Sequence, residues 1–345
     1  MDEHTEKKYK YTGAMHIHSV HSDGSGDVFE ISKAAKKAGL DWIIVSDHNN
    51  FDIEEGIFNG VYVIKGEELS YEYANHYLAL KIDKYIDFSE NAQENVDNVH
   101  KAGGFGFAVH PDESDTRKNS HSPIKWTDKN VIPDGVEIWN WFSQWGDNYD
   151  SSNVFTNAYA YFFKNRLVKK PYRETLDWWD KLNGNSEKIV PAIGGIDVHA
   201  LKRTYFIPLT IFPYDSMFKT VLNEILLNEP LSDDFETAKK QILNAVIEGR
   251  NMIFNRAVCK NPPEICITDG EQTAFSGESI YLNEKTHIKL NCGEKSDIKV
   301  YKDGKEYTFL KGKNFTVKIT EAGKYRIEAE INGFGYAYSN PIIVK

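Results

Sequence analysis

A chain of 345 residues with 41% hydrophobic residues has enough apolar material for a folded core and shows no signature of disorder. Its formal net charge of -10 argues against a nucleic-acid-binding protein, because such a protein needs a basic face. The composition therefore predicts a globular protein that acts on a small molecule, with no nucleic-acid partner.

The cysteines and the first residues indicate the cellular setting. Cys259, Cys266 and Cys292 lie late in the chain without CxxC spacing, which predicts neither a disulfide framework nor a cysteine metal site. The first ten residues are mostly charged or polar and lack the apolar segment of a secretion signal or a membrane span. We therefore expect a cytoplasmic protein with no membrane association.

From Tyr11 to about Val258, short apolar runs alternate with longer amphipathic stretches, a pattern typical of an α/β fold with a mostly parallel sheet. The predicted strands are Ala14–Ile17, Trp42–Val45, Val61–Ile64, Tyr77–Ile82, Gly106–Val109, Gly135–Ile138 and Ile189–Ile193. The predicted helices, several of which end at glycine, are Asp27–Ala38, Glu90–Ala102, Arg173–Leu182, Ser216–Leu227 and Phe235–Ile247.

One connection, at about residues 141–170, is rich in aromatic side chains. They are Trp141, Phe142, Trp145, Tyr149, Phe155, Tyr159, Tyr161, Phe162 and Phe163. We favour an elaborated packing helix here, since aromatic stripes are usually buried. A lid or pocket wall over the active site is the alternative interpretation.

The pattern changes near Asn261-Pro-Pro263. Helical periodicity disappears, and turns such as Lys302-Asp-Gly304 separate alternating strands such as Tyr325–Glu330. We therefore predict two domains, an α/β domain at residues 1–260 and a small all-β sandwich of immunoglobulin-like type at residues 261–345.

Potential metal ligands end most of the predicted strands before residue 260. His16 and His18 are two residues apart and share one face of the first strand, so both imidazoles can reach one ion. The other candidates at or near strand ends are Asp23, Asp47, His48, Glu67, Glu68, His110, Asp197 and His199. Because the carboxyl ends of parallel strands converge on one mouth, we expect these side chains to lie together.

A single histidine at a strand end is usually a hydrogen-bonded structural residue, so the argument depends on recurrence. Of the 11 histidines, six lie in or just after apolar runs, and those six are His16, His18, His48, His76, His110 and His199. His21 is undecided. So many acids beside them call for cations that neutralise them.

Five motifs in this order resemble those of the polymerase and histidinol phosphatase (PHP) family. They are His16-Ile-His18-Ser-Val-His-Ser-Asp23-Gly, Ser-Asp-His48, Gly-Glu-Glu68-Leu-Ser, His110-Pro and Gly-Ile-Asp197-Val-His199. The resemblance covers roughly residues 11–258. The appended β-domain, with its closing Tyr338-Ser-Asn-Pro-Ile342, is similar to that of the carbaryl-hydrolase-like branch (CehA/McbA type) of these metallohydrolases.

The resemblance implies a distorted (βα)7 barrel with two or three divalent metals. His16, His18, Glu68 and Asp197 would hold the first ion, Asp23, His48 and His199 the second, and Glu68, His76 and His110 the third. Glu67 is an alternative to Glu68, but the Gly-x-Glu-x-Ser alignment favours Glu68. The nitrogen and oxygen ligands suit Zn²⁺, Mn²⁺ or Fe²⁺. Asp47 is expected to orient a histidine rather than to bind metal.

The expected function is hydrolysis of a small phosphate monoester by metal-activated water, with Glu68 and Asp197 as catalytic residues. Arg203 is the best-placed cation for a phosphate, ahead of Lys202 and Arg117, although surface salt bridges explain such residues equally well. Hydrolysis of a carbamate, ester or amide is the second hypothesis, and a metal-stabilised binding protein without activity is the third. The sequence does not indicate the oligomeric state.

Overall fold

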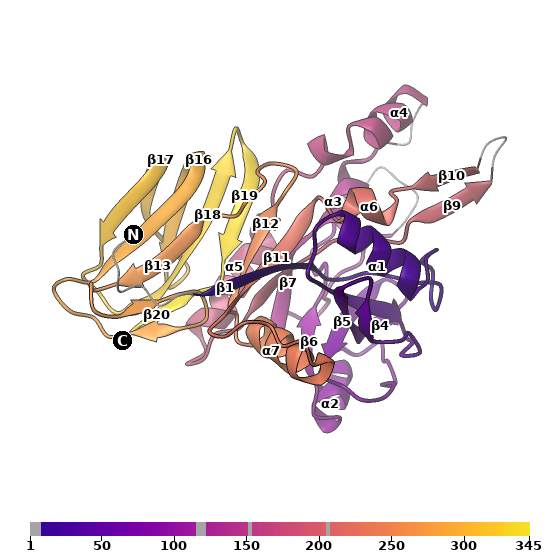
Figure 1. Cartoon of the computed structure of the whole chain (residues 1–345), viewed down its shortest axis with the longest axis horizontal. Helices are drawn as coiled ribbons and strands as arrows, with labels where there is room; N and C mark the ends of the chain where they lie inside the picture. The colour runs from indigo at the N-terminus through magenta and orange to yellow at the C-terminus, as the bar shows by residue number, and fades with distance from the viewer. Residues whose placement is uncertain (1–7, 115–121, 151–153, 205–207) are drawn as a thin grey trace.

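The computed structural model describes residues 8–114, 122–150, 154–204 and 208–345, with the backbone alone at residues 154, 203, 204 and 208. It is a mixed α/β protein (Figure 1) in which helices and strands alternate first and a region of strands alone follows. None of the described helices is both long and apolar enough to cross a lipid bilayer.

The sheet of the α/β region is less parallel than expected. β1 (Tyr9–Ala14), β2 (Trp42–His48) and β4 (Val61–Tyr71) are parallel neighbours. The same holds for β6 (Phe105–Ala108), β7 (Gly135–Asn140) and β8 (Ala192–Gly195). β5 (Ala74–Leu80) runs antiparallel to both β4 and β6. The expected mostly parallel sheet is wrong at β5, because a tight turn after β4 can join only antiparallel strands.

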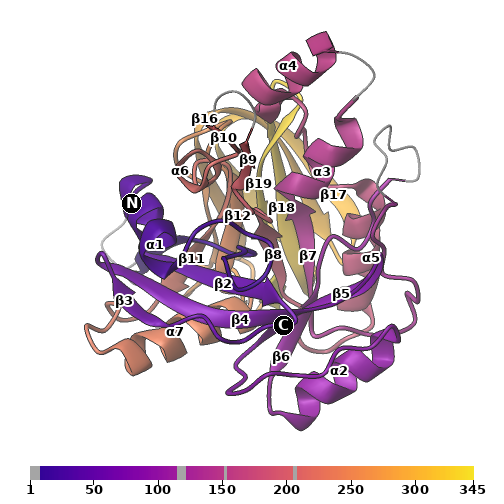
Figure 2. The ribbon, with the colours of Figure 1, turned by 90° about the vertical axis from the view of Figure 1, so that its right-hand side faces the viewer.

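Backbone hydrogen bonds also join the segments that follow β1 and β8. The amide of Asp197 donates to the carbonyl of His16 at 2.8 Å, and the amide of His18 donates to the carbonyl of Val198 at 3.0 Å. The residues that follow β8 therefore lie beside those that follow β1, and the Ser46 amide near the end of β2 donates to the carbonyl of Ile17 at 2.8 Å. Figure 2 shows β7 and β8 side by side in this region.

Four of the predicted helices are present. They are α1 (Val28–Lys37), α2 (Ala92–Lys101), α5 (Arg173–Gly184) and α7 (Phe235–Ile247). Helix α1 starts at a capping box in which the Asp27 carboxylate accepts from the Glu30 amide at 2.8 Å, which satisfies an amide that the first turn leaves free.

The helix predicted at Ser216–Leu227 is wrong. A four-residue helix, α6 (Tyr214–Met217), is followed by strand β11 (Val221–Leu227). β11 lies between β1 and β12 (Asn251–Asn255) and is antiparallel to both. Pairing with two strands distant in sequence outweighs the local helical spacing, because sheet preference depends on neighbours.

The aromatic connection forms α3 (Trp141–Asn148), α4 (Val154–Phe162) and the 3₁₀ turn Lys164–Arg166. Trp141 is fully buried, which fits the packing interpretation, whereas Phe155 and Phe162 on α4 are exposed. Figure 1 shows α4 and the hairpin of β9 (Leu201–Thr204) and β10 (Pro208–Ile211) projecting from the body of the molecule.

Beyond residue 260 the described elements are all strands, as predicted. They are β13 (Glu264–Thr268), β14 (Thr273–Ala274), β15 (Ser279–Ile280), β16 (His287–Lys302), β17 (Lys305–Lys318), β18 (Gly323–Ile331), β19 (Phe334–Ser339) and β20 (Ile342–Val344). A further short strand, β3 (Gly56–Phe58), belongs to the α/β region.

The two regions share one hydrogen-bonded sheet and a buried polar contact. β19 pairs antiparallel with β12, so the sheet continues from one region into the other. The Arg326 guanidinium donates to both oxygens of Asp180 on α5, at 2.6 and 2.5 Å, and both side chains are buried. The division into domains at residues 260 and 261 stays a prediction.

Candidate metal centre

Glu68, near the end of β4, lies at the middle of a cluster of histidines. It is fully buried. One carboxylate oxygen lies 2.9 Å from His76 Nδ1 and 3.2 Å from His110 Nε2. The other lies 3.0 Å from His48 Nδ1 and 3.1 Å from His16 Nε2. The second oxygen also lies 3.4 Å from His18 Nε2. The two oxygens thus face different imidazoles, the arrangement expected of a carboxylate that bridges two cations.

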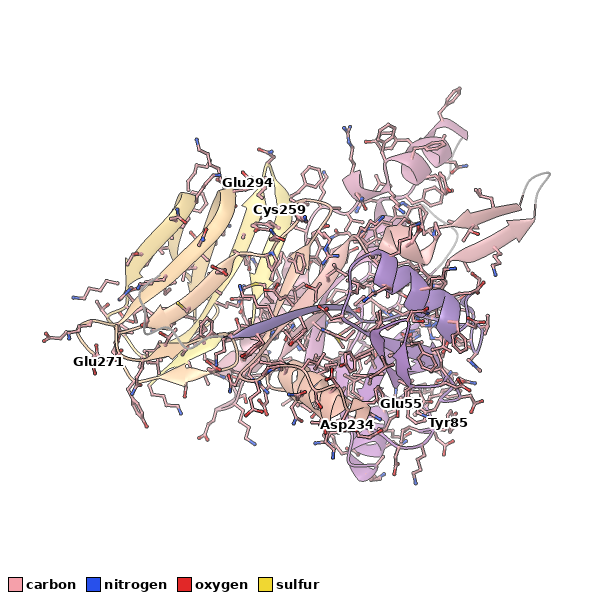
Figure 3. The ribbon with its side chains drawn as sticks, viewed as in Figure 1. Glu55, Tyr85, Asp234, Cys259, Glu271 and Glu294 are labelled. Carbon is pink, nitrogen blue, oxygen red and sulfur yellow. The ribbon has the colours of Figure 1, made fainter. Side chains whose placement is uncertain are left out.

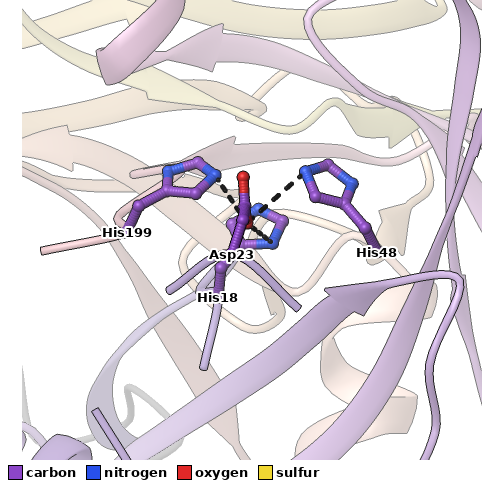
Figure 4. Close-up of side chains that lie close together, drawn as sticks. All are labelled: His18, Asp23, His48 and His199. Carbon is purple, nitrogen blue, oxygen red and sulfur yellow. Dashed lines mark ion pairs between the residues drawn. The ribbon is translucent and has the colours of Figure 1, made fainter. Parts of the chain in front are cut away.

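A second group forms around Asp23, in the turn after the first strand (Figure 4). One Asp23 oxygen lies 3.2 Å from His199 Nε2, 3.8 Å from His18 Nδ1 and 3.9 Å from His48 Nε2. The His18 ring lies between the other two, with ring centroids 4.2 Å from His199 and 4.3 Å from His48. Three ring nitrogens and a carboxylate therefore point at one small volume.

Asp197 completes the cluster from the end of β8. Its Oδ1 lies 3.1 Å from His18 Nε2 and 3.6 Å from His16 Nε2. Asp197 has a φ of 55°, and His16 and His110 have φ values of 63° and 31°. Left-handed backbone is uncommon for such residues and collects at functional sites, where the surrounding structure enforces it.

The donor set fits divalent metals. Both ring nitrogens of the buried His18, and Nδ1 of His110, have no hydrogen-bond partner among the described residues. A buried polar atom without a partner is costly, and coordination of a cation removes that cost. Four groups bring ligand atoms within 4.8 Å of one another, namely His18-Asp23-His48-His199, His16-His110-Asp197, His16-His18-Glu68 and His48-Glu68-His76.

These groups overlap the predicted ligand sets without reproducing them. The structure adds His18 to the second predicted ligand set, Asp23-His48-His199. The first is divided between two groups, and His110 groups with Asp197 rather than with His76. The structure brings all nine predicted ligands together, and the assignment of each to a particular ion stays a prediction.

The cluster keeps its acids ionised. Burial would raise the pKa of Glu68, but His48 and His16 outweigh burial and hold the pKa well below its ordinary value. Asp197 behaves alike, because His16 and His18 offset its burial and hold its pKa well below the usual range. Burial, with His199 and His48 nearby, lowers the pKa of His18 to about 4. The centre of the cluster thus combines carboxylates with a neutral imidazole, which are the protonation states that metal binding requires.

The structure separates Glu68 from its alternative, Glu67. Successive side chains of a strand face opposite ways. Glu67 points away from the cluster and accepts from the Ile86 amide at 2.9 Å. Its burial raises its pKa to about 7. Glu68 alone of this pair faces the histidines.

Among the residues that the structure describes, Asp47 forms no hydrogen bond or ion pair with a histidine side chain, so the expectation that it orients one is wrong. Its carboxylate accepts from the Ser19 amide at 2.7 Å, the Ser19 hydroxyl at 2.6 Å and the Ser22 hydroxyl at 2.5 Å. Asp47 therefore holds the turn that carries Asp23 into the site.

The carboxylate that supports the histidines is Glu137 on β7, which the sequence analysis missed. One oxygen lies 2.8 Å from His16 Nδ1, and the other accepts from the His110 amide at 2.8 Å and from Asn140 Nδ2 at 2.9 Å. Gly195 makes this possible, since a Cβ there would lie 1.6 Å from the Glu137 carboxylate. A charged residue inside the apolar run Gly135–Ile138 was the available signal.

Replacing Glu137 with Gln should lower metal affinity about 10- to 100-fold, because the carboxylate that orients His16 and favours its basic form is lost. Competition with a chromophoric chelator measures the change. Glu174→Gln, at an exposed position of α5, is the matched control and should have no effect. Unchanged affinity in Glu137→Gln would remove the positioning role.

The predicted phosphate-binding cations are only partly described. Arg117 and the side chain of Arg203 lie outside the described residues. Lys202 on β9 donates to the carbonyl of Ser25 at 3.0 Å, and the Ser25 amide donates to the carbonyl of His199 at 3.0 Å. β9 therefore runs beside the Asp23 side of the cluster.

Comparisons with known proteins give only distant similarities. No protein-family model and no curated protein matches the chain. A two-domain structure from Bacteroides vulgatus, described as containing a predicted PHP-like metal-dependent phosphoesterase, is 14% identical, with 97% of this chain and 95% of that chain covered and a TM-score of 0.47.

Two further structures are similar over shorter stretches. PsfC from Pseudomonas syringae is 12% identical over 67% of this chain and 88% of its own, with a TM-score of 0.40. A protein from Bifidobacterium adolescentis described as a putative metal-dependent phosphoesterase is 14% identical over 59% of this chain and 93% of its own, with a TM-score of 0.30. At these sequence identities and TM-scores, the similarities do not indicate the activity of this chain.

Proposed function

We propose that this chain is a metal-dependent hydrolase of the PHP type that cleaves a small phosphate monoester. The observation that carries the proposal is the cluster that six histidines form with the carboxylates of Asp23, Glu68 and Asp197. Nine ligands exceed the four or so that one tetrahedral ion can use, so the proposal includes two or three divalent ions of Zn, Mn or Fe.

The side chains divide into holding and receiving roles. Glu68 and Asp197 would hold the cations from the buried side of the cluster, because their side chains are only 0% and 10% exposed. Cations held there would lower the pKa of a water and polarise the bond to be cleaved. The Asp23 side chain is 57% exposed and that of His48 is 28% exposed, so the cluster is open on their side and substrate would approach there.

We also propose a fold assignment that matches this function. The strand order β1-β2-β4-β5-β6-β7-β8, with the hydrogen bonds from the β8 end to the β1 end, supports a distorted (βα)7 barrel. Ligands from several strand ends meet at one mouth in such barrels. Residues 261–345 would be the appended immunoglobulin-like sandwich.

The test is a panel of aryl phosphate monoesters and aryl carbamates with enzyme of measured metal content. We expect phosphate monoester hydrolysis and competitive inhibition by inorganic phosphate, because the product anion occupies the same cations. Full metal content with no turnover of either class would favour the non-catalytic binding protein instead.

Arg203→Ala should cost about 1.5–3 kcal/mol of transition-state stabilisation, as expected for loss of one charged hydrogen bond to the phosphate. The measurement is kcat/KM on a phosphate monoester. Lys188→Ala, which removes an exposed positive charge from another part of the chain, is the control. Unchanged turnover in Arg203→Ala would assign the phosphate to other cations, Lys202 first.

Carbamate or ester hydrolysis stays a second candidate because an aromatic wall adjoins the cluster. The ring centroids of Phe142 and His199 lie 5.4 Å apart. The ring centroid of Trp145 lies 4.7 Å from that of Tyr149 and 4.7 Å from that of Phe212. Loss of aryl carbamate cleavage in Trp145→Ala or Trp141→Ala, with no inhibition by phosphate, would favour this candidate.

A further inference from the structure

A cavity of about 610 Å³ lies where the α/β region meets the C-terminal strands. Lys10, Leu226 and Met252, from β1, β11 and β12, line one side, and residues of β13, β16 and β17 line the other. Its volume falls in the ~300–1,000 Å³ range of small-molecule sites. The cavity shares no lining residue with the metal cluster, so it is a separate feature of the molecule.

The lining is mostly apolar. It includes Leu226, Met252, Cys266, Phe275, Leu290 and Phe315. Two aromatic rings and several aliphatic side chains around one space favour a ligand with an apolar body, whose transfer from water supplies the driving force.

Two polar groups in the cavity lack hydrogen bonds among the described residues. Ser276 is 1% exposed, and its buried hydroxyl has no partner. The carboxylate of Glu224 on β11 forms no hydrogen bond with any described residue, and burial raises its pKa although the Lys10 charge nearby acts in the opposite direction. Buried polar atoms are normally paired, so the Ser276 hydroxyl points to a partner supplied from outside the chain, and the half-buried Glu224 carboxylate offers the same ligand an unoccupied acceptor.

Three lysines line the cavity, and none of them is free: Lys289 has an interaction partner of its own, and the other two are paired with carboxylates. Lys10 Nζ lies 2.6 Å from Glu264, and Lys8 Nζ lies 2.6 Å from Glu278. An anionic ligand would have to displace a carboxylate from one of them and would also face Glu224. A cationic donor meets Glu224 with no displacement, so charge favours an amine over an acid.

We propose that this cavity binds a small amphipathic amine, with its apolar body among Leu226, Phe275 and Phe315 and its amino group directed to Glu224 and the Ser276 hydroxyl. Binding requires no covalent step and no metal. It adds to the chain a ligand site distinct from the hydrolytic centre.

Isothermal titration of the full-length, metal-loaded protein with octylamine, octanol and octanoate tests the proposal. The three probes each have eight carbons in an unbranched chain and differ in the head group. We expect saturable binding of one octylamine per chain, at least about ten-fold tighter than octanol, and no binding of octanoate. No saturable binding of any probe, or octanoate binding as tightly as octylamine, would overturn the proposal.

Two variants locate the bound amine. Glu224→Gln keeps the shape and removes the charge, so octylamine affinity should fall to that of octanol. Glu229→Gln, in the exposed turn after β11, is the matched control and should bind as the parent does. Leu226→Trp should fill the cavity and remove binding of both probes. Undiminished octylamine binding in Glu224→Gln would contradict the proposal.

A measurement on the unaltered chain covers the case in which Leu226→Trp does not fold. Cys266 lines the cavity, whereas Cys259, labelled in Figure 3, does not. Octylamine should therefore slow modification of Cys266 by a thiol reagent, read by peptide mass mapping, and leave the rate at Cys259 unchanged. Equal rates at Cys266 with and without octylamine would place the amine elsewhere.

Discussion

Glu68→Gln should reduce hydrolysis by at least about 10²-fold and remove at least one metal ion from each chain. Both Glu68 oxygens face histidine nitrogens, at 2.9 and 3.2 Å on one side and 3.0 and 3.1 Å on the other. An amide replaces one of these oxygens with a hydrogen-bond donor and removes the charge that offsets two cations. Steady-state turnover and elemental analysis on the same preparation measure both effects.

The adjacent Glu67→Gln is the matched control. The Glu67 side chain is also buried, but it lies on the opposite side of β4, where its carboxylate accepts a hydrogen bond from the Ile86 amide. We expect it to keep full metal content and turnover, with any change confined to stability. Full activity and metal in Glu68→Gln would defeat the bridging role, and a loss confined to Glu67→Gln would transfer that role to Glu67.

Removal of metal with a chelator should abolish hydrolysis and lower the melting temperature by roughly 5 °C or more. A ligand held at about 100 times its Kd contributes roughly 2.7 kcal/mol to stability, and each kcal/mol shifts Tm by about 2–4 °C in domains of this size class. Reconstitution with Zn²⁺, Mn²⁺ or Fe²⁺ should restore both, with two or three ions per chain. At most one ion after reconstitution would contradict a multinuclear centre.

Metal uptake should also weaken as pH falls. Burial lowers the pKa of His48, but Glu68 outweighs burial and raises it to about 9 in the chain without metal. A cation must therefore displace a proton from this imidazole, and protons compete more strongly at lower pH. A metal affinity that does not change between pH 6 and pH 9 would show that His48 is not a ligand.

Local patterns were enough to predict which side chains form the cluster. Polar side chains at the ends of short apolar runs, from His16 to His199, are visible in the order of residues alone, because strand ends are short-range features. The expectation that His16 and His18 share one face of the first strand is wrong, because β1 ends at Ala14 and His16 has a φ of 63°. The all-strand character beyond residue 260 and helices such as Phe235–Ile247 were predicted for the same reason, since each depends on spacing within one segment.

Features that depend on distant partners were decided only by the tertiary structure. The run after Met217 became a strand because β1 and β12 lie on either side of it, although its spacing indicated a helix. Glu137 supports His16 only because β7 and β8 are neighbours and Gly195 leaves room for its carboxylate. The cavity around Glu224 exists only because the C-terminal strands cover the β1-β11-β12 face. In each case the free energy comes from contacts between residues far apart in the chain, which no local pattern encodes.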